Sequence, residues 1–223
     1  ETAPGNLSGA VHIVEKQPAT AKSSIKIIAL RFYRYKTAVG REPCHRRIVS
    51  FRTPGNSHAF GVHRPEGVID LSGETGFSEL LQLSAPAIAD LAHAAQRAGH
   101  APLAFDQLDL LPVVPRPGKF ICLGLNYLEH AREGGTHKLP PYPTLFMRGP
   151  TSLQAAGKPI VRSSISATLD FEAELAVVIG KGGRAIAEDR ALEHVAGYSI
   201  FNDVTVREYQ RITTQWTPGK NFD

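Results

Sequence analysis

The stretch "LDFEAELAVVIG", residues 169–180, alternates apolar and acidic side chains and closes on a glycine. Successive side chains of a strand point to opposite faces. Glu172 and Glu174 therefore share one face, and apolar residues from Phe171 to Ile179 share the other. Two carboxylates side by side repel each other and are costly to dehydrate. The stretch predicts a strand whose acidic pair needs a positive charge beside it.

A third acid follows a second strand-like run. In "YSIFND" the apolar residues end at Asn202 and Asp203. Three carboxylates gathered at strand ends suit a hard cation such as Mg²⁺, Mn²⁺ or Ca²⁺. We therefore predict a metal site at Glu172, Glu174 and Asp203. Two other interpretations stay open, namely an exposed edge strand for the glutamates and a turn that starts a helix for Asp203.

Composition places the chain among ordinary globular proteins. Of its 223 residues, 42% are hydrophobic and 21% are charged. No run of 18 apolar residues occurs, which argues against a membrane span. The two cysteines, Cys44 and Cys122, show no zinc or disulfide spacing and are typical of a reducing compartment, so we expect a cytoplasmic protein. Cys122 is predicted to be a buried, inert thiol.

The basic charge is confined to the start of the chain. Residues 1–47 contain nine Lys or Arg and three Glu, which leaves 16 basic and 18 acidic residues beyond them. The basic residues are scattered rather than clustered, so we expect no nucleic-acid partner. Residues 1–46 are predicted to be a flexible basic extension.

The rest of the chain divides at a proline-rich linker, Leu111–Lys119. Residues 47–111 are predicted to form a small α/β domain, and residues 112–223 a catalytic domain. The predicted strands are "IVSF", "HAFGVH", "GVIDLS", "KFICLGL" and "YSIFN"; the predicted helices are "PAIADLAHAAQRAG", "NYLEHAREGG", "AEDRALEHVAGY" and the one that begins after "YSIFND". Ser84 fits the start of the first helix, and Thr205 with Glu208 fits a capping box in the last one.

Two further groups of residues are suited to chemistry. His130 and Glu133 lie three apart in "NYLEHARE", where a carboxylate can orient an imidazole as a general base. Arg207, Gln210 and Lys220 are suited to holding an anionic substrate. Seen alone, each group is more typical of a solvated surface.

The order of these blocks resembles the fumarylacetoacetate hydrolase family. "KFICLGLNYLEHARE", "PTLFMRGPTSL", "LDFEAELAVVIGKGGRAI", "AGYSIFNDVTVREYQ" and "QWTPGKNFD" follow one another from about Pro117 to Asp223. The resemblance implies an α+β fold, a mixed β-sandwich roll with short peripheral helices, and a homodimer. It also implies that residues 48–110 are the small N-terminal domain of bacterial members.

The resemblance implies a site and a reaction. Glu172, Glu174 and Asp203 match metal-binding positions for Mg²⁺ or Mn²⁺, and His130 with Glu133 matches the pair that activates water. Arg207, Gln210 and Lys220 match positions that hold the substrate, with Lys220 donating to oxyanion charge. The implied reaction is hydrolysis of a C–C bond in an acylpyruvate-like 2,4-dioxo acid. The alternatives are an isomerase or decarboxylase of aromatic catabolism, or an inactive fragment.

The chain departs from the family pattern at two residues and at its end. Leu125 stands where many members have Arg, and Arg148 stands where Lys is common, which leaves the substrate open. Family members continue with further strands beyond the block that matches "NFD". The resemblance therefore predicts that these residues alone are C-terminally incomplete, and poorly soluble or inactive.

Overall fold

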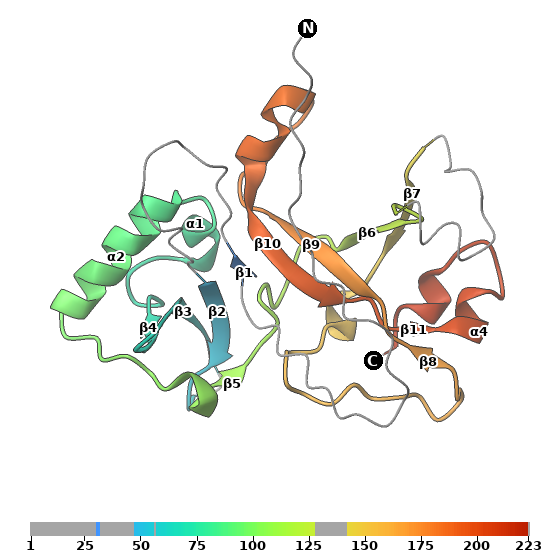
Figure 1. Ribbon diagram of the computed structural model, residues 1–223, viewed down its shortest axis with the longest axis horizontal. Coiled ribbons are helices and arrows are strands. Elements are labelled where there is room, and N and C mark those ends of the chain that lie inside the picture. Colours follow the sequence, from blue (N-terminus) through green and yellow to red (C-terminus); the bar gives the residue numbers. More distant parts are fainter. Residues whose placement is uncertain (1–29, 32–46, 56, 128–141, 223) are drawn as a thin grey trace, which may run out of the picture.

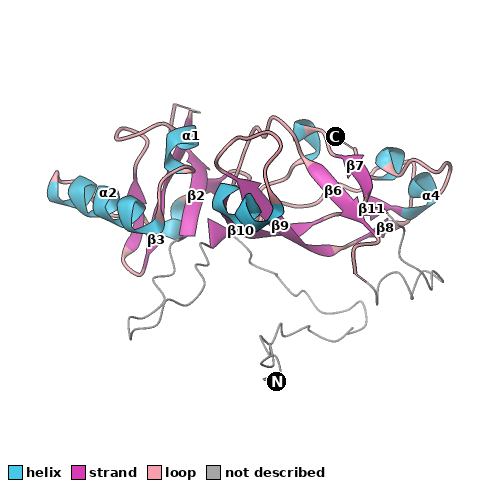
Figure 2. Cartoon of the chain, turned by 90° about the horizontal axis from the view of Figure 1, so that it is seen from above, coloured by secondary structure: helices cyan, strands magenta, loops and turns pink. Residues whose placement is uncertain are grey.

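The computed structural model describes residues 30–31, 47–55, 57–127 and 142–222 (Figures 1 and 2). Its content is mixed α and β, in agreement with the predicted α+β class. None of the helices in these ranges is long and apolar enough to cross a membrane. Of the predicted extension 1–46, the structure describes only the short strand β1, Leu30–Arg31.

The first half of the described chain is an antiparallel meander covered by helices. Strands β2 (Arg47–Arg52), β3 (His58–Arg64) and β4 (Gly67–Asp70) pair in sequence order, and β5 (Asp109–Leu110) pairs with the end of β2. Helices α1 (Phe77–Leu80) and α2 (Ala85–Arg97) follow β4. The main core contains Ile48, Phe60, Val62, Ile69, Leu71, Leu80, Ile88 and Ala92, all buried. These apolar side chains leave water together, which drives this half to fold.

The second half contains three antiparallel strand pairs. They are β6 (Ile121–Gly124) with β7 (Thr144–Met147), β8 (Leu169–Asp170) with β11 (Thr205–Val206), and β9 (Ala173–Ile179) with β10 (Val195–Asn202). The short helices of this half are α4 (Arg207–Gln210) and the 3₁₀ turns η2 (Pro150–Ser152), η3 (Glu188–His194) and η4 (Thr217–Gly219); the turn η1 (Phe105–Gln107) precedes β5 in the first half.

One sheet links the two halves in the order β4-β3-β2-β1-β10-β9. Ala196 of β10 belongs to the main core. The backbone of Leu81 also lies close to Gly180: a Cβ added at Gly180 would be 2.2 Å from the carbonyl oxygen of Leu81. Figure 1 shows the β9–β10 hairpin between α1 and α2 on one side and the smaller strand pairs on the other. The start of β9 and the end of β10, which adjoin the candidate site described below, therefore lie at the end of the hairpin remote from α2.

Most predicted elements are confirmed, and two local predictions are wrong. The strands of the first half are present, and the Ser84 side chain accepts a hydrogen bond from the backbone N–H of Ala87 at the start of α2. The predicted helix of "AEDRALEHVAGY" is instead the turn η3 followed by β10, and Leu192 is 70% exposed. No side chain caps α4, because Thr205 belongs to β11 and its hydroxyl bonds elsewhere.

The alternation predicted for residues 169–180 is present, but the strand is interrupted. Strand β8 ends at Asp170 and β9 begins at Ala173, so Glu172 lies at a bend between them. The acidic face with Glu174 is half-buried, and the apolar face is exposed, with Leu175 at 58%. The alternation of faces is therefore correct, while the tertiary contacts decide which face is covered.

Candidate active site

The bend at Glu172 lies beside the end of β10. The backbone N–H of Asp203 donates to the carbonyl of Glu172 at 2.8 Å, and the side chain of Asn202 accepts from the N–H of Glu172 at 3.0 Å. These two bonds bring segments 30 residues apart into register. The carboxylates of Glu172 and Asp203 thereby come to one place, as the sequence predicted.

A buried lysine lies between these two carboxylates. The Nζ of Lys220 is 2.8 Å from Oε2 of Glu172 and 2.7 Å from Oδ2 of Asp203, and its side chain is 2% exposed. The ammonium also lies 5.1 Å from the ring centre of Phe146. A buried charge is tolerated when it is paired and hydrogen-bonded. Lys220 therefore supplies positive charge to Glu172 and Asp203 in this structure.

Arg207 neutralises the outer side of the same cluster. Its Nε donates to Asp170 at 2.9 Å, and its Nη1 donates to Oε1 of Glu172 at 2.5 Å and to the amide oxygen of Gln210 at 3.0 Å. The one-turn helix α4 places Arg207 and Gln210 on one face, as their spacing predicted. The two predicted substrate-binding residues thus contact each other, and Arg207 also contacts Glu172 and Asp170.

Sequence reasoning did not place Asp170 or Arg148 in the site, although it noted Arg148 as a departure from the family pattern. Asp170 binds Arg207, and it precedes Glu172 and Glu174 at the same two-residue spacing, which was the available signal. Arg148 binds Asp203, the carbonyl of Lys220 and the carbonyl of Val204. No local pattern pointed to Arg148, because its partners lie more than 50 residues away along the chain.

The positive neighbours keep Glu172 ionised. Burial by itself would raise the pKa of this carboxyl group, but hydrogen bonds and charges from Lys220 and Arg207 outweigh it and hold the pKa below its ordinary value. The hydroxyl of Thr205 is also 3.2 Å from Oε1 of Glu172. The cluster therefore presents anionic carboxylates next to a fixed ammonium.

Three further residues were predicted for the site: Glu174, His130 and Glu133. Within the described ranges, no three His, Cys, Asp or Glu side chains come close enough to hold a metal ion. Glu174 lies on β9, two residues beyond the bend, and pairs in register with Phe201. The structure thus joins two of the three predicted metal ligands around Lys220. His130 and Glu133 lie outside the described residues.

Cys122 on β6 lies near the cluster and has a suppressed thiolate. Burial and then the negative charge of Asp203 raise the pKa of this thiol to about 12. This agrees with the predicted inert thiol, although the side chain is half-buried rather than fully buried. The thiolate is the reactive form of cysteine.

We expect Cys122 to react with iodoacetamide at pH 8 roughly a thousandfold more slowly than an ordinary thiol. The reason is that the raised pKa lowers the fraction of Cys122 present as thiolate at pH 8 by about the same factor. The measurement uses a Cys44→Ser background, so that only one thiol remains, and compares folded with denatured protein. Equal labelling rates in the two states would contradict the effect of burial.

Comparison with known proteins adds an independent line of evidence. Residues 119–223 match the family model described as the fumarylacetoacetate hydrolase C-terminal domain. The mitochondrial oxaloacetate tautomerase fahd2 of Xenopus laevis is 33% identical over 187 residues, 79% of this chain and 58% of the relative. The oxaloacetate tautomerase YisK of Bacillus subtilis is 42% identical over 114 residues, 49% of this chain and 38% of the relative.

Solved structures give the same result for the fold. A fumarylacetoacetate hydrolase from the psychrophilic Exiguobacterium antarcticum aligns with a TM-score of 0.62 at 30% identity, over 80% of this chain and 62% of that chain. A probable 2-hydroxyhepta-2,4-diene-1,7-dioate isomerase from Mycobacterium abscessus aligns with a TM-score of 0.58 at 31% identity, over 79% of this chain and 59% of that chain. The chain thus spans less than two thirds of the length of these proteins. The sequence blocks, the fold and these matches together show that the chain belongs to the fumarylacetoacetate hydrolase family.

Proposed function

We propose that this protein catalyses keto–enol tautomerisation of a small 2-oxo dicarboxylic acid, with oxaloacetate as the first substrate to test. The observation that carries the proposal is the buried ammonium of Lys220, held by two carboxylates next to Arg207 and Gln210. A fixed cation of this kind stabilises negative charge on an enolate oxygen. The names of the two curated relatives support the choice of substrate.

The reaction moves one proton from the enol oxygen to the neighbouring carbon and shifts the double bond from C=C to C=O. When the enol becomes the ketone, the enol oxygen loses its proton, the oxygen–carbon bond becomes double, and the neighbouring carbon gains a proton. Lys220 donates a hydrogen bond to the oxygen as charge develops on it, and Arg207 with Gln210 orients a substrate carboxylate. No bond between carbon atoms breaks, so this reaction needs no activated water.

Members of this family commonly use divalent metals. Mg²⁺ and Mn²⁺ are hard cations that prefer several carboxylate oxygens. Here the ammonium of Lys220 lies between Glu172 and Asp203, and the described residues assemble no set of three ligands. The arrangement does not fit the predicted three-carboxylate metal site, and the steps above use only groups of the chain.

C–C bond hydrolysis, our first expectation from the sequence, is the second candidate. The observation that favours it is the His130–Glu133 pair, whose spacing suits a water-activating dyad. The two reactions differ in their need for that dyad. A substitution of Glu133 therefore distinguishes tautomerisation from C–C bond hydrolysis.

We expect the protein to accelerate the decay of the oxaloacetate enol, followed through its ultraviolet absorbance, and Glu133→Ala to keep that activity within about threefold. The same substitution should abolish any cleavage of an acylpyruvate, with a loss on the order of 100-fold or more. Enol decay no faster than in buffer would contradict the tautomerase proposal. Acylpyruvate cleavage that depends on Glu133, without enol decay, would establish hydrolysis instead.

A further inference from the structure

Arg148 is a buried guanidinium that ties three parts of the site together. It follows β7, is 6% exposed, and donates to the Asp203 carboxylate and to the backbone carbonyls of Val204 and Lys220. Its guanidinium carbon also lies 5.4 Å from the ring centre of Phe201. One side chain thus contacts both segments that deliver the acid and the ammonium of the cluster.

The two oxygens of Asp203 are divided between two cations. Oδ1 accepts from Arg148, and Oδ2 lies 2.7 Å from the Nζ of Lys220. With Oδ1 held, rotation of the carboxylate is restricted and Oδ2 faces Lys220. The bond from Arg148 to the Lys220 carbonyl also fixes the backbone from which the ammonium extends.

We propose that Arg148 is a positioning residue, which orients Asp203 and the Lys220 backbone so that the ammonium is held where enolate charge develops. The inference rests on the function proposed above. The planar fork of the Arg148 guanidinium donates to three acceptors at once, whereas a lysine, which is common at this position in the family, supplies one nitrogen. Misplacement of a catalytic group by about 1 Å can lower a rate on the order of 100-fold.

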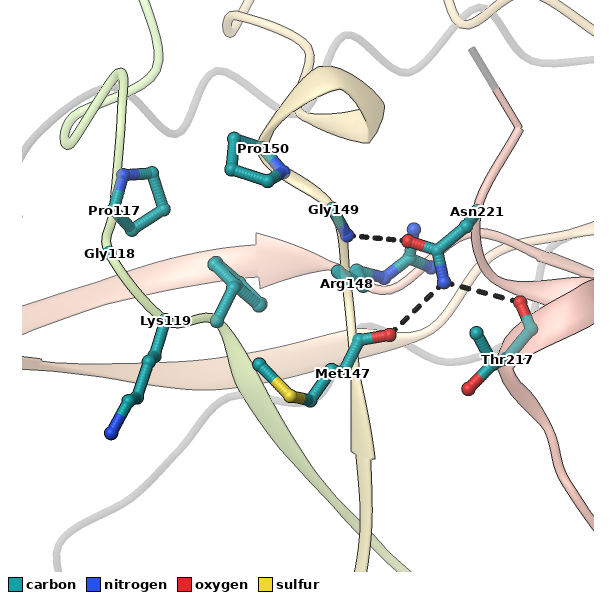
Figure 3. A pocket seen from close by; sticks show the side chains of 10 residues that line it. Pro117, Gly118, Lys119, Met147, Arg148, Gly149, Pro150, Thr217 and Asn221 are labelled. Atoms are coloured by element: carbon teal, nitrogen blue, oxygen red, sulfur yellow. Dashed lines mark hydrogen bonds between the residues drawn. The ribbon is translucent and has the colours of Figure 1, made fainter.

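A cavity of about 330 Å³ has Arg148 among its lining residues (Figure 3). Its lining includes Lys119, Met147, Gly149 and Thr217. A substitution of Arg148 by alanine would therefore leave a guanidinium-sized space next to solvent. Small cations can enter such a space, which makes chemical rescue a direct test.

Asn221 offers a matched control at the same junction. Its side chain accepts from the backbone N–H of Gly149 at 2.6 Å and donates to the carbonyl of Met147 at 3.0 Å (Figure 3). It therefore joins the end of β7 to the segment after η4, as Arg148 does. Among the described residues, Asn221 bonds to Gly149, Met147 and Thr217 and not to Asp203, so its removal loosens the junction without releasing that carboxylate.

The experiment compares Arg148→Lys, Arg148→Ala and Asn221→Ala in oxaloacetate enol decay. For both Arg148 variants we expect kcat to fall roughly 100-fold and KM to stay within about threefold, because the residue acts through its neighbours and touches no substrate. Guanidinium ion at non-denaturing concentration should restore at least about a tenth of the lost rate to Arg148→Ala, whereas sodium should not. Asn221→Ala should keep kcat within about threefold. Wild-type kcat in Arg148→Lys, or equal losses in Arg148→Ala and Asn221→Ala, would overturn the inference.

A second readout separates this inference from the proposed function. Acetylation of lysines, mapped by mass spectrometry, should modify Lys220 at least about tenfold faster in Arg148→Ala than in wild type, relative to the exposed Lys158. If wild-type protein shows no enol decay but Lys220 becomes accessible, the proposed reaction fails while the positioning of Lys220 stands. If Lys220 stays protected in Arg148→Ala, Arg148 does not position it.

Discussion

Replacement of Lys220 by methionine is expected to lower kcat for enol decay by about 100- to 1000-fold, the usual effect of removing one oxyanion donor. The same change should lower the free energy of unfolding by about 3–5 kcal/mol, because it leaves buried carboxylates without their partner. Methionine keeps most of the length of the lysine side chain but removes the ammonium, which lies 5.1 Å from the ring centre of Phe146. The loss therefore measures the charge rather than the packing volume.

The matched control for Lys220 is Lys158→Met. Lys158 lies 2.6 Å from Asp109, but both side chains are about half exposed. Exposed ion pairs contribute about 0–1 kcal/mol, so this variant should unfold at nearly the wild-type denaturant concentration and keep its rate. Chemical denaturation and kinetics of both variants make the comparison. Equal stability of Lys220→Met and Lys158→Met would show that the buried pair contributes little.

The arrangement around Lys220 explains what local sequence could reveal about the site. The two-residue spacing of Glu172 and Glu174 correctly placed Glu174 on a strand, with Glu172 just before its start, and the three-residue spacing of Arg207 and Gln210 correctly placed them on one helical face. Both are short-range patterns of strand and helix geometry. Lys220, which lies 48 residues from Glu172, was predicted with Arg207 and Gln210 as an anion-binding group, and the resemblance to the family added its role at oxyanion charge.

Features set by distant contacts were not predictable in the same way. The break between β8 and β9 depends on pairing with two separate strands, β11 and β10. That break moves Glu172 to a bend and leaves Glu174 inside the strand. The compensating charge was predicted to be a metal ion, yet the described structure supplies side-chain cations. A pattern of acidic residues indicates that positive charge is needed nearby, but it does not indicate whether a metal ion or a side chain supplies that charge.

Gly124→Ala is expected to lower the free energy of unfolding by about 1–3 kcal/mol and to displace Trp216. Gly124 ends β6, and a Cβ added there would lie 1.8 Å from the Trp216 ring. Trp216 in turn packs edge-on against Phe146 and immediately precedes η4, which leads to Lys220. An added methyl group must therefore shift the ring, and with it the segment that carries the ammonium.

The chain contains one tryptophan, so its fluorescence reports on this site directly. We expect Gly124→Ala to change the emission maximum of Trp216 and to lower kcat in parallel, whereas the same substitution at Gly118 should change neither. An added Cβ at Gly118 meets no atom within 4 Å. If the emission of Trp216 moves while kcat stays at the wild-type value, η4 holds Lys220 independently of the ring. If neither changes, Gly124 does not pack against Trp216 in this way, and the path from β6 to the ammonium is wrong.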